Sequence, residues 1–181
     1  MRPARPPKAC SRMRGDASGG AGAMAVRPAR AEEAAALTAL MRALAAEMGD
    51  PTDLLTPRHV AEDILGDRCG IVAVAESAGA GLVGYATAHP TYETAHAEAG
   101  LYVGDLYVRP AHRRRGVAQA LLAALARAGH ARGARHLWLT AREGNGAAHA
   151  LYRRLGGRGE RVLAFAVTGQ DFLNLAALRP R

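Results

Sequence analysis

One stretch near the middle of the chain constrains the fold more than any other. An apolar strand over residues 101–108 is stopped by Pro110, and three consecutive arginines then precede Gly116. After that glycine, apolar residues recur at the three-and-four spacing of a helix, and a second apolar run follows at residues 136–140. Strand, basic turn, helix and strand form a crossover unit, which predicts two parallel strands within an α/β fold.

The basic turn indicates an anion site. Its arginines, Arg113, Arg114 and Arg115, lead into a helix whose first-turn N–H groups have no partner within the helix. These groups and the positive end of the helix dipole favour a phosphate or pyrophosphate. No G-K-[ST] follows, which disfavours a Walker A loop with ATP and magnesium. A solvated basic surface turn is the alternative interpretation.

Hydrophobic period and turn residues predict the remaining elements. Helices are expected after Arg30 up to Met48, after the Thr56 cap up to Leu65, from Val117 to about 129, and after the Asn145 cap up to Leu155. Strands are expected at 25–30, 71–76, 82–88, 101–108, 136–140, 161–167 and 172–175, with a polar loop at 89–100. The fold class is therefore a mixed α/β sheet of about seven, mostly antiparallel strands around a central parallel crossover, with about four helices.

Length and composition fit one ordinary domain. The chain has 181 residues, 49% of them hydrophobic, and no apolar run approaches the roughly 20 residues that cross a bilayer. Residues 1–23 are rich in Pro, Arg, Gly and Ala without apolar period, so we expect a disordered basic extension before a single domain at 24–181. Met24 is then the expected true start. With only Cys10 and Cys69, a disulfide scaffold is disfavoured and the cytoplasm is the expected compartment.

The net charge of +8 has two competing explanations. An acidic partner such as nucleic acid is one, and arginine-favouring codon usage is the other. Half of the excess sits in residues 1–23, and 23 of the 24 basic residues are arginine. Aromatic residues are only 4% of the chain, and no reader helix or aromatic set accompanies the charge. We therefore expect no nucleic-acid or membrane partner. The histidines show no metal-ligand spacing, so no metal is expected.

Two motifs carry more information than charge. The first is R-R-R-G-V-A at residues 113–118, directly after the strand that ends at Val108, and the second is N-G-A-A-H-A-L-Y-R-R-L-G at residues 145–156. In this order, about 30 residues apart, they resemble the [R/Q]-x-x-G-x-[G/A] pyrophosphate loop and the N-x-x-A-x-x-L-Y-x-x-L-G segment of the GNAT superfamily of acetyl-CoA-dependent N-acetyltransferases. The resemblance covers residues 25–176.

The resemblance implies a binding site for acetyl-CoA as co-substrate. It implies that the pantetheine arm meets the strand end and that the pyrophosphate meets the turn and helix start. The residues are Leu106, Tyr107 and Val108 for the arm, Arg113, Arg114, Arg115, Gly116, Val117 and Ala118 for the pyrophosphate, and Asn145 as a further cofactor contact.

Tyr152 and Asp105 are the candidate catalytic residues. The resemblance implies that the Tyr152 phenol gives a proton to the departing CoA sulfur, whereas packing between Leu151 and Leu155 is the purely structural alternative. Asp105 lies in an apolar strand and could orient an ammonium group or a water, or it could simply face solvent. Substrate contacts are also plausible in the loop at 89–100, which contains His89, Glu93, His96 and Glu98.

Within the superfamily, the segments around 92–94 and 100–110 look most similar to the diamine and thialysine type of acetyltransferase. Gly104 departs from that type, which often has an acid beside the aspartate. The expected function is acetyl transfer from acetyl-CoA to a primary amine of a small molecule by direct attack. A catalytically silent acetyl-CoA sensor is the alternative. The resemblance also makes a homodimer possible.

Overall fold

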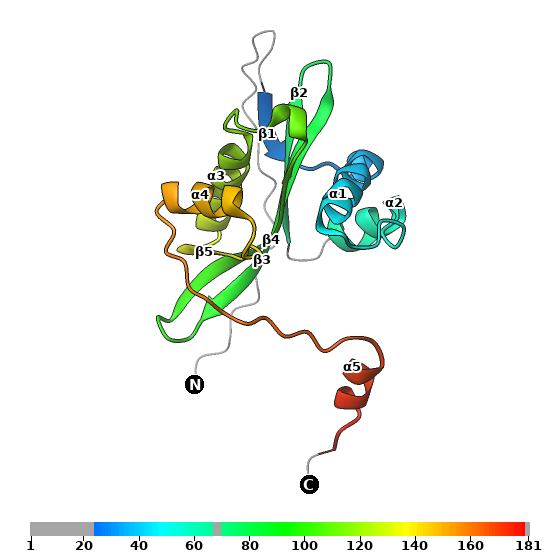
Figure 1. The fold of residues 1–181 in the computed structure, drawn as a ribbon, viewed down its shortest axis with the longest axis vertical. Helices are drawn as coiled ribbons and strands as arrows, with labels where there is room; N and C mark the ends of the chain where they lie inside the picture. Colours follow the sequence, from blue (N-terminus) through cyan, green and yellow to red (C-terminus); the bar gives the residue numbers. More distant parts are fainter. Residues whose placement is uncertain (1–23, 67–69, 180–181) are drawn as a thin grey trace, which may run out of the picture. The chain divides into compact units, whose positions relative to one another are not determined.

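The computed structural model describes residues 24–66 and 70–179 (Figure 1). The chain divides into two compact units, one that ends at Thr140 and one that begins at Ala141. The expected extension at 1–23 and Cys69 lie outside the described residues.

The first unit is built on one five-stranded sheet in the order β1-β2-β3-β4-β5. The strands are β1 Met24–Pro28, β2 Ile71–Ser77, β3 Gly81–Glu93, β4 Glu98–Val108 and β5 His136–Leu139. Neighbouring strands are antiparallel except β4 and β5, which pair in parallel. The parallel pair confirms the crossover that the basic turn and its flanking strands predict.

The helices of this unit begin and end at residues whose chemistry favours a helix end. They are η1 Ala31–Glu33, α1 Ala34–Met48, α2 Pro57–His59 continued by the π-helical turn η2 Val60–Ile64, η3 Pro110–His112 and α3 Val117–His130. Gly49, at φ +76°, ends α1, and the Thr56 hydroxyl accepts a 3.2 Å hydrogen bond from the His59 N–H. None of the helices in the described ranges has both the length and the apolar character needed to span a membrane.

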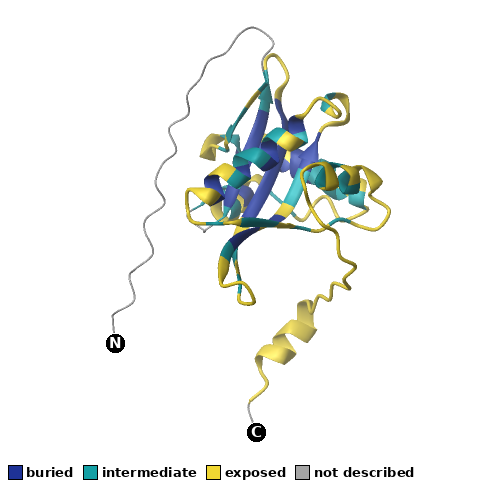
Figure 2. Ribbon diagram, turned by 90° about the vertical axis from the view of Figure 1, so that its left-hand side faces the viewer, coloured by how far each residue is buried: buried dark blue, intermediate teal, exposed yellow. Residues whose placement is uncertain are grey.

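Helices cover both faces of the sheet (Figures 1 and 2). On one face, here called the α1 face, Leu37, Leu40 and Met41 of α1 pack against Tyr85 and Tyr107 of the central strands. On the opposite α3 face, the buried leucines of α3 cover β2, β3 and β4. Because side chains alternate along a strand, register then assigns each β3 and β4 residue to one of these faces.

The polar segment at 89–100 is not the loop that its composition predicts. β3 continues to Glu93 and β4 starts at Glu98, so the two strands form a long hairpin that turns at residues 94–97. Pro90 is tolerated because it lies beyond Ala88, where the pairing of β3 with β2 ends. The loop prediction is therefore wrong.

The second unit contains α4 Gly146–Arg154 and α5 Gly169–Ala176. The strands predicted at 161–167 and 172–175 are absent from this unit: the first segment is irregular and the second is part of α5. No strand in the described chain pairs with 161–167, and Leu163 and Phe165 are 84% and 89% exposed. Phe172 and Leu175 fit a helical period, whereas Leu173 and Leu175 also fit an alternating one, and this ambiguity explains the second error.

Candidate functional site

The parallel pairing of β4 is short and leaves one edge of this strand open. β5 pairs only with residues 100–103 of β4, whereas β4 continues for five more residues to Val108. The described residues place no strand beside 104–108 on that side. Leu106, Tyr107 and Val108, the residues expected to meet the pantetheine arm, lie in this segment. Its open backbone edge can accept and donate hydrogen bonds to an extended ligand.

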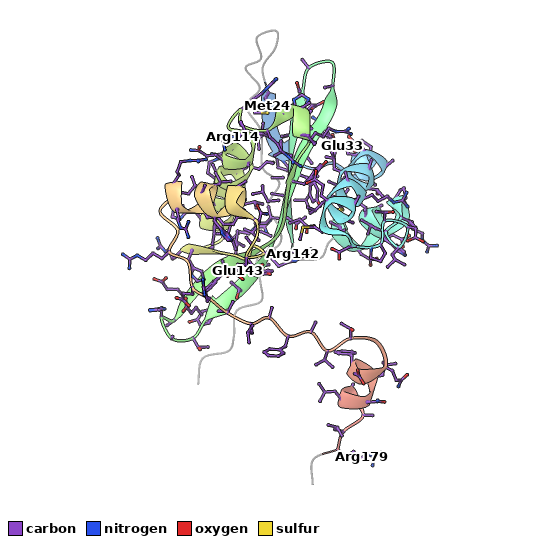
Figure 3. The ribbon with its side chains drawn as sticks, in the orientation of Figure 1. Met24, Glu33, Arg114, Arg142, Glu143 and Arg179 are labelled. Atoms are coloured by element: carbon purple, nitrogen blue, oxygen red, sulfur yellow. The ribbon has the colours of Figure 1, made fainter. Side chains whose placement is uncertain are left out.

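The helix that follows begins with an open anion site. Gly116 is the N-cap of α3 with φ +80°, and no side chain in the described chain caps the first-turn N–H groups of this helix. Arg114 also has a positive φ of 62°, so the turn is held in a conformation that ordinary residues avoid. The side chains of Arg114 and Arg115 are exposed, and Figure 3 shows Arg114 in the loop that leads into α3. The first-turn groups at Val117 and Ala118 are therefore available to an anion.

Arg113 occupies a different position from its two neighbours. Its Nε donates a 2.7 Å hydrogen bond to the Val108 carbonyl, and its Nη2 donates a 2.5 Å hydrogen bond to Glu47 of α1. Its guanidinium carbon also lies 5.6 Å from the centre of the Tyr107 ring. Arg113 therefore fixes the end of β4 against α1 and the turn. Spacing alone could not show this, because the Glu47 partner lies 66 residues away in the sequence.

Asp105 lies on the α1 face at a kink in β4. Gly104 is the extra residue of a β-bulge, because Thr87 pairs with Asp105 and the next residue, Ala88, pairs with Val103. The Asp105 N–H donates a 3.0 Å hydrogen bond to the Thr87 hydroxyl. A Cβ at Gly104 would lie 3.2 Å from that same hydroxyl, so the bulge favours glycine.

The Asp105 carboxyl is mostly buried, and this burial raises its pKa above the ordinary range. A hydrogen bond from Tyr85 and the nearby His89 oppose the increase without cancelling it. Burial and the Asp105 charge in turn raise the pKa of Tyr85. Sequence reasoning missed Tyr85 and Thr87. Tyr85, Thr87 and His89 lie at alternate positions of one strand, and this spacing indicates that their side chains share a face. Asp105, the strand partner of Thr87, lies on the same face.

The other candidate loop residues lie along the β3–β4 hairpin. The His96 ring nitrogen lies 3.0 Å from Glu93, and the His136 ring nitrogen lies 3.9 Å from Glu98. Only His89 of the four neighbours Asp105. In the described part of the chain, no group of three or more His, Cys, Asp or Glu side chains is arranged to hold a metal ion.

Asn145 and Tyr152 both belong to α4, in the second unit. The Asn145 carboxamide oxygen accepts a 3.1 Å hydrogen bond from the Ala148 N–H, which confirms the predicted cap. Tyr152 follows seven residues later, two helical turns along the same side. Tyr152 is partly buried, and burial raises the pKa of its phenol above 10. The phenol therefore keeps its proton at neutral pH and can act as a proton donor.

Comparison with known proteins finds the same fold in solved structures. The chain is similar to an aminoglycoside acetyltransferase from an uncultured soil metagenomic sample, with 29% identity and a TM-score of 0.69 over 81% of this chain and 99% of that one. Two further solved structures share the fold at lower identity. AAC(6')-Iy in complex with the bisubstrate analog CoA-S-monomethyl-acetylneamine has 24% identity and a TM-score of 0.68 over 80% of this chain and 97% of that one. A ribosomal-protein-alanine N-acetyltransferase from Brucella melitensis biovar Abortus 2308 has 22% identity and a TM-score of 0.65 over 81% and 99%.

No curated protein matches the chain. The sequence profile of the acetyltransferase (GNAT) family, in contrast, matches residues 37–157, about two thirds of the chain. The match includes the open segment of β4, the basic turn and α4. This chain belongs to the acetyltransferase (GNAT) family.

Proposed function

We propose that this protein transfers the acetyl group of acetyl-CoA to a primary amine of a small molecule. The open edge of β4 beside the uncapped start of α3 carries the proposal. An extended, amide-containing arm that ends in a pyrophosphate matches an unpaired strand edge followed by a helix N-terminus. The Arg113 hydrogen bond to Val108 fixes these two features to each other.

Backbone groups of Leu106, Tyr107 and Val108 would bind the pantetheine arm. The N–H groups of Gly116, Val117 and Ala118, together with the exposed Arg114 and Arg115, would bind the pyrophosphate. Because the Arg113 guanidinium already bonds to Val108 and Glu47, we assign it mainly to positioning the turn. The Asn145 oxygen caps α4, and the nitrogen of its carboxamide would supply the cofactor contact.

In the proposed reaction, acetyl-CoA supplies an acetyl group activated as a thioester. A C–N bond forms between the acceptor amine and the acetyl carbon, the C–S bond breaks, the amine loses a proton and the CoA sulfur gains one. Tyr152 would give its phenolic proton to the sulfur. The Asp105 carboxylate would hold the acceptor ammonium and receive its proton directly or through water.

Aminoglycosides are the first acceptors to test. The metagenomic relative is an aminoglycoside acetyltransferase, and its match spans nearly its whole length. The diamine type is less well supported, because its additional acid is replaced by Gly104, at the bulge where a Cβ would crowd Thr87.

The test is the release of free thiol from acetyl-CoA with aminoglycosides, diamines, thialysine-like amino acids and peptides. We expect release with one amine class. Tyr152→Phe should lower kcat about 10- to 100-fold and leave acetyl-CoA affinity within about 2-fold, because the hydroxyl acts only as the sulfur leaves. An unchanged kcat would assign the proton to water instead. Acetyl-CoA binding without thiol release from any amine would favour a silent sensor.

A further inference from the structure

The α1 face of the sheet changes character along β4. Around Tyr85 and Tyr107 it is covered by α1 and fully buried. Two register positions beyond Asp105 it is open, and two aromatic side chains lie there. Tyr102 of β4 is 41% exposed and Trp138 of β5 is 43% exposed. Asp105 therefore lies where the covered core meets an open aromatic surface.

Pairing and hydrogen bonding place the two aromatic residues side by side. Tyr102 and Trp138 are direct partners in the parallel β4–β5 register, so their side chains project from the same face. The Tyr102 hydroxyl lies 3.1 Å from the Thr140 hydroxyl, which fixes the Tyr102 ring at the edge of the sheet. Tyr102 is also the register partner of His89, which projects from this face like Asp105.

We propose that Tyr102 and Trp138 are the surface on which a ring of the acceptor stacks while its amine reaches Asp105. This inference rests on the proposed function and deepens it: it selects amines carried on saturated rings over linear amines. The distance along β4 from Tyr102 to Asp105 is roughly 7–10 Å, from the rise of a strand with one bulged residue. A sugar ring with its amino group spans such a distance.

The chemistry of the surface fits a cyclic polyamine. Aromatic faces are negative at their centres, so they attract the ammonium groups of such a ligand as well as the apolar face of its ring. The Asp105 carboxyl is mostly buried beside them, and by register Glu93 and Glu98 project from the same face, so the negative charges of this face complement a cationic ligand. A flexible linear amine would meet the same charge, but it offers no ring to cover the two aromatic residues.

Trp138 is the only tryptophan of the chain, so its fluorescence reports directly on this surface. Acrylamide should quench it in the free protein. Neamine, a cyclic aminoglycoside, should change its intensity and protect it from acrylamide, and spermine, a linear amine with as many nitrogens, should not. A tryptophan that acrylamide cannot reach would show that another part of the chain covers the surface, and would overturn the proposal.

Kinetics provide the second readout. Trp138→Ala should raise KM for neamine about 10-fold, within the range for loss of one stacking contact, and change KM for acetyl-CoA and spermine less than about 2-fold. Trp138→Phe should restore most of the neamine affinity, which separates stacking from folding. The matched control is Tyr92→Ala: Tyr92 is 61% exposed in the β3–β4 hairpin that contains Tyr102, but it projects from the opposite face.

An equal loss for neamine and spermine in Trp138→Ala would contradict the proposal, as would unchanged fluorescence with neamine at saturating concentration. The fluorescence readout does not require turnover. Protection of Trp138 by neamine without acetylation would therefore support this surface and contradict the proposed reaction, whereas acetylation without protection would do the opposite.

Discussion

At the scale of single residues, Asp105 shows how a fold can make a carboxyl chemically useful. Its position at the bulge is fixed by the Thr87 hydroxyl, and its surroundings are largely apolar. Burial raises its pKa, so at neutral pH the folded protein bears the free-energy cost of a desolvated charge. A group retained at such a cost suits the binding of an ammonium ion.

Asp105→Asn should therefore reduce activity and increase stability. We expect kcat/KM at neutral pH to fall about 10- to 100-fold, because a charged hydrogen bond to the acceptor is lost. In the wild type, kcat/KM should fall as pH falls through a pKa above the ordinary aspartate value of 3.8, because the carboxyl takes up a proton. This limb should be absent in Asp105→Asn. His89→Gln is the control for the neighbouring imidazole, and it should keep this limb.

Stability gives the same variant an independent readout. Because the folded-state pKa of Asp105 is raised, folding favours the protonated form, and the stability cost grows as pH rises from the unfolded-state pKa through the folded-state pKa. The cost is absent below that window. Asp105→Asn should therefore have a higher Tm than the wild type at neutral pH and an equal one in acid. A lower Tm at neutral pH would show that the carboxylate stabilises the fold and would argue against a functional role.

At the scale of elements, the sequence predicted the helices whose ends are marked by capping residues or by glycine. Thr56, Asn145 and Gly49 mark helix ends that the structure contains. The crossover was predictable because a basic turn separates an apolar strand from a segment with the three-and-four apolar spacing of a helix, and a second apolar strand follows. The length of the β3–β4 hairpin was not predictable. The parts of β3 and β4 that extend past β2 contain polar residues, which are typical of a loop. The Asp105 environment was also hidden, since it depends on a one-residue bulge that no local pattern marks.

Gly84 tests how tightly the central strands hold the binding edge. A Cβ there would lie 2.8 Å from the Tyr107 carbonyl oxygen, 3.3 Å from Val108 and 3.4 Å from Leu121 of α3. Gly84→Ala should destabilise the fold by about 1–3 kcal/mol, or about 3–10 °C in Tm, and raise KM for acetyl-CoA because β4 must move. Gly144→Ala is the control, because nothing lies within 4 Å of its Cβ position. Equal Tm values for the two variants would contradict this packing.

At the scale of the whole molecule, the proposed reaction draws on both units. The open edge, the basic turn and Asp105 belong to the first unit, whereas Asn145 and Tyr152 belong to the second. The family match continues across the boundary between the units, to residue 157. A ligand that binds only the folded state stabilises the molecule by mass action, whichever amine the protein acetylates.

Acetyl-CoA should raise the Tm of the full chain by about 5–10 °C at 100 times its Kd, which corresponds to about 2.7 kcal/mol of stabilisation. Gly116→Glu should abolish this shift. The structure leaves open space around a Cβ at Gly116, so the cause is the added negative charge at the anion site and the strain at φ +80° rather than a clash. Gly133→Glu separates these causes, because Gly133 also has a positive φ and open space but follows the C-terminal end of α3. Both variants should lose intrinsic stability, and only Gly116→Glu should lose the response to acetyl-CoA in thermal scans. Equal responses in the two variants would place the pyrophosphate elsewhere.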